Sequence, residues 1–499
     1  MSDFELSELD QCLLPYDFVR SKHIAAFDNE DKCTVITPND INLDTYHELS
    51  RFLKKAIVIK QCSSDEFDHL ITKVFSSDHN SGILSEELTD EFDLASFANT
   101  IAPTEDLLSG TDDAPIIKLI NGIISQAIKQ RASDIHFEPY EDKFVVRFRI
   151  DGILRKILTQ DSRIAPIIIS RIKIISRLDI SERRLPQDGR VSLSLGKKSI
   201  DVRVSTLPSS YGERVVLRLL DKESSQINID DLGLNKVVLS NFKKSLNSSE
   251  GMILVTGPTG SGKTTTLYAG LRHINDNSLN ILTVEDPIEY TLEGIGQTQV
   301  NNKTGYDFAR GLRSILRQDP DVVMLGEIRD EETARIAIQS SLTGHLVMST
   351  VHTNSAAGAI TRLRDMGIES FLLASSLKTI ISQRLIRRIC NRCKTESKVS
   401  QIAIELLGLK KDETVFEANG CNQCEGSGFR GRIAIAESIQ ISSHLKDMIH
   451  DEASEQDIQN YALKGTQSID QIGSELLTKG LTSTEELIRI NNQKENASI

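Results

Sequence analysis

The residues with the clearest chemistry form a glycine-rich run from Gly257 to Thr264. This run, GPTGSGKT, follows the apolar segment MILVT and precedes the periodic pattern of a helix. Glycines let a backbone close around a ligand without a Cβ clash, so backbone N–H groups can hold phosphate there. We expect Lys263 to reach the β- and γ-phosphate oxygens and Thr264 to bind magnesium. The predicted nucleotide-binding residues are Gly257, Pro258, Thr259, Gly260, Ser261, Gly262, Lys263, Thr264 and Thr265.

Acidic residues end two further strand-like segments. NILTVEDPIEY carries Glu285 and, beyond the proline, Glu289, whereas VVMLGEIRD places Glu327 one residue after the usual aspartate position, which Gly326 holds. The carboxyl ends of parallel strands line one ligand crevice, so we expect both acids at one edge. Glu327 is predicted to bind magnesium through water or to orient the attacking water, and Glu285 to polarise that water as a base. For either acid alone, a solvated strand end is the alternative.

Two histidines flank a third strand-like segment, GHLVMSTVHTN. His345 and His352 lie seven positions apart, so on a regular strand they face opposite sides and cannot both touch one ligand. His352, at the carboxyl end, is the better candidate for contact with a γ-phosphate. His345 alone is better explained as a packed or capping residue.

Arginines recur on a predicted helix and on the middle segment of the chain. In YDFARGLRSILRQDP, Phe308, Leu312 and Ile315 form a buried face, and the arginines that share another face are Arg310, Arg313 and Arg317. Such a stripe is commonly solvated, but phosphoryl transfer needs cations, which motor ATPases take from a neighbouring domain or subunit. Arg203 and Arg218 are the candidates from the middle segment.

The chain has seven cysteines, and four of them form the pairs CNRC and CNQC, separated by residues 394–420. This spacing suits a tetrahedral zinc site that fixes an insertion too short to bury a core of its own. The predicted ligands are Cys390, Cys393, Cys421 and Cys424. A redox dithiol is the alternative. Cys12, Cys33 and Cys62 are scattered and are interpreted as free thiols of a reducing compartment.

Composition restricts the possible partners. The 499 residues carry a formal net charge of −13, which opposes a broad phosphate-binding surface, so no nucleic-acid partner is expected. No apolar run approaches the ~20 residues of a membrane span. The acidic start, MSDFELSELDQ, lacks the apolar region of a signal peptide. We therefore expect a cytoplasmic chain that reaches a membrane only through protein partners.

The patterns divide the chain into four segments. Residues 1–76 form a small α+β module with strands at KCTVIT and AIVIKQC and a helix at SSDEFDHLITKVF, where Ser63 and Glu66 make a capping box. Residues 77–113 form an acidic linker without Lys or Arg. Residues 114–228 form a mixed α+β domain, and residues 229–499 form a parallel α/β domain with a cysteine-bearing insertion at 390–432 and a helical tail.

In the middle segment, KFVVRFRIDGIL alternates inward and outward side chains and turns at Asp151–Gly152. The inward residues are Phe144, Val146, Phe148 and Ile150. The second hairpin, SIDVRVSTLPSSYGERVVLRLL, sets Arg203 and Arg218 on strands that pair.

These motifs together resemble the secretion ATPase superfamily. Within it the chain is most similar to the type II secretion system ATPases of the bacterial inner membrane, the general secretion pathway protein E family. The resemblance runs from about Pro15 through the tail and is most specific between residues 111 and 390. It rests on DDAPIIKLING, ASDIHFEP, RLPQDGRVSL, DVRVSTLPSSYGERVVLRLLD, GPTGSGKTTTLYAGL, ILTVEDPIEY, GIGQTQVN, ARGLRSILRQDPDVVMLGEIRDEETA and LTGHLVMSTVHTN.

The resemblance implies a RecA-like ATPase domain, a mobile PAS-like middle domain and a homo-hexamer with ATP sites between the two domains. It equates Lys263 and Thr264 with the Walker A pair, Glu327 with a late Walker B acid, and His345 with the His box. Glu285 and Glu289 fall in its acid-rich box. Its phosphate-contacting arginines correspond to Arg203, Arg218, Arg313 and Arg317. The first module would dock on the cytoplasmic domain of a bitopic inner-membrane protein, and the ring would push a polytopic platform protein.

We therefore expect a motor that couples ATP hydrolysis to the export of folded proteins across the outer membrane. The alternative is a type IV pilus assembly ATPase, which shares the catalytic motifs and the cysteine pairs, but the short first module followed by DLLSGTDDAPIIKLIN favours secretion. A nucleic-acid translocase would show a basic domain or an aromatic platform, and neither is visible. A switch GTPase is excluded because LNKVV lacks the aspartate of a guanine-reading motif.

Overall fold

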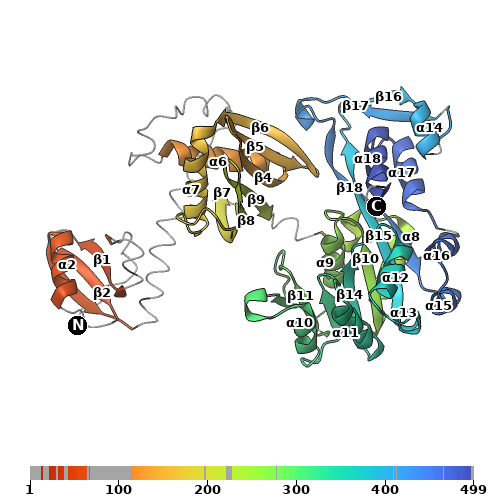
Figure 1. Cartoon of the computed structure of the whole chain (residues 1–499), viewed down its shortest axis with the longest axis horizontal. Helices are drawn as coiled ribbons and strands as arrows, with labels where there is room; N and C mark the ends of the chain where they lie inside the picture. The colour runs from red at the N-terminus through yellow and green to blue at the C-terminus, as the bar shows by residue number, and fades with distance from the viewer. Residues whose placement is uncertain are drawn as a thin grey trace. The chain divides into compact units, whose positions relative to one another are not determined.

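The computed structural model describes most of residues 13–63, residue 67, and residues 114–495 apart from 196–197, 221–226, 277, 408, 412 and 465. The chain divides into two compact units, Met1–Leu220 and Asp221–Ile499, which are described separately below (Figure 1). Nearly all of the predicted helix after Cys62 and the whole acidic linker lie outside the described residues. No helix of the described part is long and apolar enough to cross a bilayer.

The first unit begins with a three-stranded sheet in the order β1-β2-β3. Its elements are β1 (Ala25–Asn29), β2 (Lys32–Thr37), α2 (Leu43–Leu53) and β3 (Ala56–Gln61). The strands β2 and β3 confirm the two predicted from sequence and run parallel, whereas β1 pairs antiparallel with β2. Leu49 of α2 packs against Phe27 and Val35 of the sheet, so the helix covers a small apolar core.

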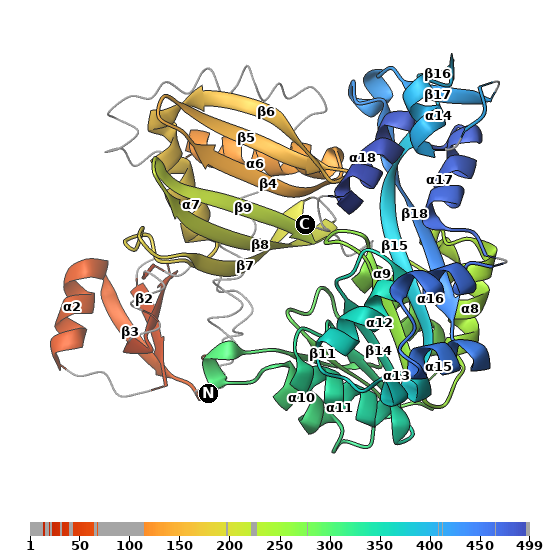
Figure 2. The same ribbon diagram turned by 45° about the vertical axis from the view of Figure 1, so that its right-hand side comes forward.

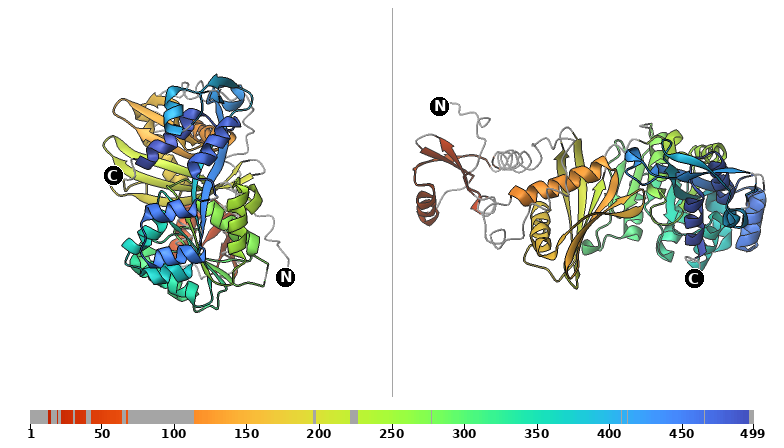
Figure 3. Two further views of the ribbon diagram at one scale, coloured as in Figure 1. Left: turned by 90° about the vertical axis from the view of Figure 1, so that its right-hand side faces the viewer. Right: turned by 90° about the horizontal axis from the view of Figure 1, so that it is seen from above.

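The same unit contains a six-stranded antiparallel sheet in the order β6-β5-β4-β9-β8-β7 (Figure 2). The strands are β4 (Ala132–Pro139), β5 (Lys143–Ile150), β6 (Ile153–Asp161), β7 (Gln187–Leu195), β8 (Lys198–Ser209) and β9 (Gly212–Leu220). The helices α6 (Ala114–Lys129) and α7 (Ala165–Ile175) lie side by side on one face of this sheet (Figure 3). Their isoleucines meet Phe137, Phe144 and Phe148 in a shared core.

The predicted alternation of β5 is present. Phe144, Val146 and Phe148 are buried while Arg147 is partly exposed, although the neighbouring Val145 is buried as well. The predicted turn after β5 places Asp151 and Gly152 at positive φ, as a tight hairpin of this kind requires.

The second unit is built on a seven-stranded sheet in the order β12-β11-β13-β14-β10-β15-β18. All strands but the edge strand β18 run parallel to their neighbours, which confirms the predicted parallel α/β domain. The strands are β10 (Gly251–Thr256), β11 (Ile281–Glu285), β12 (Gly296–Gln299), β13 (Val322–Leu325), β14 (Leu346–Val351), β15 (Leu377–Ile389) and β18 (Phe429–Gln440).

Helices cover both faces of this sheet, so its strands are apolar along their whole length. Met252 and Leu254 of β10 face one core, which they share with α10 to α13, α15 and α16, while Ile253 and Val255 face another, shared with α8 and α9. The helices are α8 (Lys236–Leu246), α9 (Lys263–Ile274), α10 (Phe308–Ile315), α11 (Glu331–Leu342), α12 (Ala356–Asp365), α13 (Ser370–Ser376), α15 (Ser443–His450) and α16 (Glu455–Ala462).

The cysteine-bearing insertion lies between the long strands β15 and β18, which run toward it from the main sheet (Figure 2). It contains β16 (Lys394–Lys398), α14 (Gln401–Leu407) and β17 (Thr414–Ala418). Val399 and Val415 share one apolar core with Ile472 and Leu487 of the tail helices α17 (Ile469–Thr478) and α18 (Thr484–Glu495). The insertion therefore borrows its core from the tail, besides whatever its cysteines hold.

Candidate functional site

The phosphate loop joins the end of β10 to the start of α9 at the carboxyl edge of the parallel sheet. Gly257, Gly260 and Gly262 have φ values of 145°, 78° and 87°, which side chains rarely adopt. A Cβ on Gly257 would lie 2.3 Å from the carbonyl oxygen of Gln383. A Cβ on Gly260 would meet nothing within 4 Å, so the loop is tight at its start and open at its middle.

Two polar groups of this loop fit a bound phosphate. The Ser261 hydroxyl is buried and has no hydrogen-bond partner among the described residues. The Lys263 ammonium donates to the carbonyl oxygens of Gly257 at 2.9 Å and Pro258 at 3.2 Å. Burial lowers the pKa of Lys263 to about 8, against the opposing influence of Glu327. An anion in the loop would give the ammonium its missing counter-charge, so the residues present fit the phosphates of a nucleotide.

Glu327 and His352 meet at the same edge. Glu327 follows β13 and His352 follows β14, the next strand, and His352 Nε2 lies 3.2 Å from Glu327 Oε2. Arg329 donates to the other carboxylate oxygen of Glu327. Burial raises the pKa of Glu327, but the hydrogen bond and charge of Arg329, with His352, outweigh it and hold that pKa below its usual value. Burial and the charge of Lys263 lower the pKa of His352. At neutral pH the site thus presents a carboxylate beside a neutral imidazole.

Threonines of β14 and β10 fix this arrangement. The Thr350 hydroxyl donates to the carbonyl of Gly326 at 2.7 Å, which holds the turn that precedes Glu327. Thr256, at the end of β10, shares a hydrogen bond of 2.6 Å with the Thr353 hydroxyl beside His352. The late acid is therefore held in place by its neighbouring strands.

Glu285 ends β11, which pairs with β13, so the predicted meeting of the two acidic strands at one edge is confirmed. Its carboxylate is only 2% exposed and accepts hydrogen bonds from Tyr268, from Thr283 at 2.6 Å and from Gln297 at 3.0 Å. Glu327, and not Glu285, is the carboxylate whose charge acts on Lys263. The role of Glu285 as a base stays a prediction, and the structure places it in a buried hydrogen-bond network.

His345 lies away from this edge. It precedes β14, and its Nδ1 is 3.0 Å from the carbonyl oxygen of Ser340 in the last turn of α11. The length of β14 puts it roughly 20 Å from His352. Within one chain the structure thus brings His352, and not His345, to Glu327.

The predicted arginines have local partners. Arg313 pairs with Glu332, and Arg317 donates to the carbonyl of Arg313 at 2.9 Å. Arg203 and Arg218 lie directly opposite each other on β8 and β9, as the hairpin pattern predicted. Arg218 binds Asp134 at 2.9 Å. A part for these four arginines in a shared ATP site stays a prediction.

Sequence reasoning missed three polar residues of the site. Arg329 contacts Glu327, as described above. Gln383 of β15 binds Ser261 and Thr266, and Arg384 donates to the carbonyl of Asn354 at 2.7 Å and acts electrostatically on Lys263. The available signal was the pair Gln383–Arg384, which interrupts the otherwise apolar strand pattern TIISQRLI.

The four predicted zinc ligands converge, and their sulfur atoms all lie within 4.8 Å of one another. The separations Cys390–Cys421, Cys393–Cys424 and Cys421–Cys424 are 3.9, 3.7 and 3.7 Å. Zinc–sulfur bonds of about 2.3 Å in a tetrahedron place sulfurs about 3.8 Å apart, so the cluster fits this ion. Four convergent thiols disfavour a redox dithiol, which needs only two.

Backbone N–H groups also prepare this cluster for a cation. The N–H groups of Cys421 and Gly428 lie 3.1 and 3.2 Å from the Cys424 sulfur. Burial raises the pKa of Cys424, but these backbone groups outweigh it and lower the pKa to about 6. A thiolate is the form that binds a metal.

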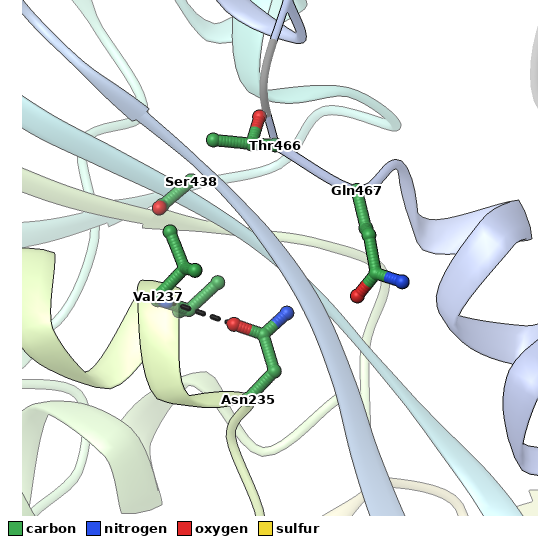
Figure 4. A pocket seen from close by; sticks show the side chains of 6 residues that line it. Asn235, Val237, Ser438, Thr466 and Gln467 are labelled. Carbon is green, nitrogen blue, oxygen red and sulfur yellow. Dashed lines mark hydrogen bonds between the residues drawn. The ribbon is translucent and has the colours of Figure 1, made fainter.

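A separate hollow in the second unit carries no chemistry of this kind (Figure 4). Its lining consists of Asn235, Val237, Val238, Ser438, Thr466 and Gln467. None of these side chains titrates, and the Asn235 carbonyl already accepts from the N–H of Val238 at 2.8 Å as the cap of α8.

Two family models match the chain. Residues 109–489 match the type II/IV secretion system protein family, and residues 13–75 match the N-terminal domain family of GSPII protein E. Curated relatives include type II secretion system protein E of Pseudomonas aeruginosa, 47% identical, and that of Aeromonas hydrophila, 48% identical, each alignment covering 96% of both chains. Type II secretion system ATPase E of Vibrio cholerae is 46% identical over the same shares.

Solved structures agree with the fold. The pilus retraction motor PilT with bound ADP is 27% identical, with a TM-score of 0.53 over 74% of this chain and 95% of that chain. The Legionella pneumophila ATPase DotB is 19% identical, with a TM-score of 0.57 over 75% of this chain and 96% of that one, and supports the fold alone.

Proposed function

The chain belongs to the type II/IV secretion system protein family, and from this premise we propose that it is the hexameric motor ATPase of a type II secretion system. It is an ATP-hydrolysing enzyme, and its work would be the export of folded proteins across the outer membrane. One observation carries the choice of system: relatives named type II secretion system protein E match the chain over 96% of its length, including the module at residues 13–75. A pilus assembly ATPase is the alternative that this module disfavours.

The site residues divide the work of hydrolysis. Lys263 and the N–H groups of the loop would hold the β- and γ-phosphates, and the Thr264 hydroxyl would bind Mg²⁺. The bound ion would neutralise part of the charge that develops on the transferred phosphoryl group. Glu327 would orient and activate the attacking water, and His352, 3.2 Å from its carboxylate, would keep that carboxylate in place and contact the γ-phosphate. Glu285 would support this edge from its network with Tyr268 and Gln297.

Assembly would complete the site. In the proposed homo-hexamer, closure of the domain at 114–228 on the ATPase domain at 229–499 brings Arg203 and Arg218 to the phosphates, and Arg313 and Arg317 act from α10 and the residues after it. The developing charge of phosphoryl transfer is the physical reason for this supply of cations. Hydrolysis then reopens the domains, and sites that fire in turn around the ring push a polytopic platform protein of the inner membrane.

Attachment would come from residues 1–76. This module carries no phosphate-loop residue, and its described core around Phe27 and Leu49 is separate from the ATPase cores. We assign to it the docking on the cytoplasmic domain of a bitopic inner-membrane protein, with residues 77–113 as the tether. The protein would then work in the cytoplasm, peripheral to the inner membrane.

Zn²⁺ is the ion that we assign to the four cysteines. Bound there, it would cross-link the two ends of the insertion at 390–432, next to the core that the insertion shares with the tail. Sulfur separations near 3.7–3.9 Å support this choice.

Deletion of the gene tests the proposal. Folded exoproteins are expected to accumulate in the periplasm, while surface pili persist. Normal secretion with lost pili would instead identify a pilus assembly ATPase. Stimulation of the ATPase by DNA or RNA, and not by an unrelated polyanion, would support a nucleic-acid translocase.

A further inference from the structure

The side chain of Gln383 ties the end of the phosphate loop to the first turns of α9. It is 2% exposed. Its Nε2 donates to the carbonyl oxygen of Ser261 at 2.8 Å, and its Oε1 accepts from the Thr266 hydroxyl at 2.8 Å. Both hydrogen bonds are buried, and each uses the amide end that has the right polarity. A carboxylate in this place could accept from Thr266 but could not donate to Ser261.

Gln383 also packs against the glycines at both ends of the loop. A Cβ on Gly257 would lie 2.3 Å from the Gln383 carbonyl oxygen, and a Cβ on Gly262 would lie 2.9 Å from its Nε2. The absence of side chains at these two positions therefore lets β15 come close to the loop. Gln383 touches the loop at its start, at its end and at the helix that follows.

The Ser261 contact fixes the direction of one N–H group. A trans peptide is planar, so the carbonyl of Ser261 and the N–H of Gly262 point in opposite directions. Because Gln383 holds this carbonyl on the β15 side, the Gly262 N–H must point away from β15. The Ser261 hydroxyl, buried without a partner among the described side chains, marks a second donor of the same segment that is left for a ligand.

We propose that Gln383 is a positioning residue for nucleotide binding: it orients the Ser261–Gly262 peptide so that the N–H of Gly262 faces the phosphates. The role rests on the nucleotide site proposed above and adds a residue from outside the glycine-rich run. Gln383 touches no phosphate itself and acts only through the loop.

The variant Gln383→Glu tests the proposal through pH. At pH 8 the carboxylate cannot donate to Ser261, and we expect kcat/KM for ATP and affinity for a fluorescent ADP analogue to fall at least ~10-fold. Burial raises the pKa of the new carboxyl, and the protonated acid regains one donor and one acceptor. At pH 6 both quantities should return to within about threefold of the wild-type values at that pH.

The matched control is Gln440→Glu in the full-length chain. Gln440 lies on β18, pairs with Thr379 at the opposite end of β15, and also accepts from a threonine hydroxyl, at 2.7 Å. This variant should bind and hydrolyse as the wild type does at both pH values. A second variant, Thr266→Val, removes the hydroxyl that orients the Gln383 amide and should weaken ADP binding about threefold at either pH.

Each result decides the matter. Wild-type kcat/KM for Gln383→Glu at pH 8, an equal loss at pH 6 and pH 8, or unchanged ADP binding by Thr266→Val would overturn the role of Gln383. If Gln383→Glu does not fold, Thr266→Val alone decides. Failure of the wild-type chain to bind ADP would overturn the nucleotide site itself, which is a distinguishable outcome.

Discussion

The phosphate loop and the cysteine cluster are two sites of opposite character on one strand. β15 passes the loop at Gln383 and ends just before Cys390. In the loop, a buried hydroxyl has no partner in the described chain and burial depresses the pKa of the lysine. In the cluster, four sulfurs already stand at metal-binding separations, and backbone N–H groups serve one of them. The loop therefore gains most from a ligand that comes and goes, while the cluster suits an ion that stays.

Loss of the loop cation should have the largest effect on catalysis. Lys263→Ala removes the point charge that faces the β- and γ-phosphates, and we expect kcat to fall more than ~100-fold while the fold is kept. Steady-state ATP hydrolysis and circular dichroism measure the two quantities. Turnover within tenfold of the wild type would show that the loop works without this charge.

The cluster should show the reverse pattern. Cys390→Ser with Cys421→Ser leaves two thiols, too few for a closed zinc site, and we expect the bound zinc, about one ion per chain, to be lost. The melting temperature should fall by on the order of 10 °C, with ADP affinity changed less than about threefold. Elemental analysis, calorimetry and ADP titration test this. Metal-free wild-type protein of normal stability would remove the zinc assignment.

The depressed pKa of Lys263 makes nucleotide binding sensitive to alkali. The charged amine binds phosphate, and a bound phosphate raises the pKa of that amine, so affinity is full below about pH 8 and declines above it. We expect ADP affinity to fall by up to about tenfold per pH unit between pH 8 and 10. Lys263→Arg should flatten this dependence because its guanidinium keeps its proton. A wild-type affinity that is constant from pH 7 to 9.5 would contradict the assignment.

The two histidines provide the finest test of the phosphate edge. His352→Ala removes a contact of Glu327 and should slow hydrolysis about tenfold. His345→Ala removes only the contact with Ser340 and should cost about 1 kcal/mol of unfolding free energy with turnover within about twofold. Equal losses of turnover in both variants would show that His345 acts on a nucleotide in the assembled ring.

What the sequence predicted follows from how local each signal is. The phosphate loop, the parallel strands and the cysteine pairs depend on short patterns, and the meeting of β11 with β13 follows from the rule that strand ends share an edge. The hydrogen bond between Gln383 and Ser261 joins residues 122 positions apart, and it depends on which strand lies beside the loop. The network around Glu285 and the core shared by insertion and tail likewise depend on three-dimensional packing that no local pattern encodes.

The variant Glu327→Gln tests the central claim, that this carboxylate at the phosphate edge converts ATP into export. The amide keeps the size of the side chain but loses the charge that orients and activates water. We predict wild-type ATP affinity, hydrolysis reduced more than ~100-fold, and exoproteins retained in the periplasm of cells that carry only this variant. Rapid turnover by the purified variant, or continued secretion by those cells, would contradict the account.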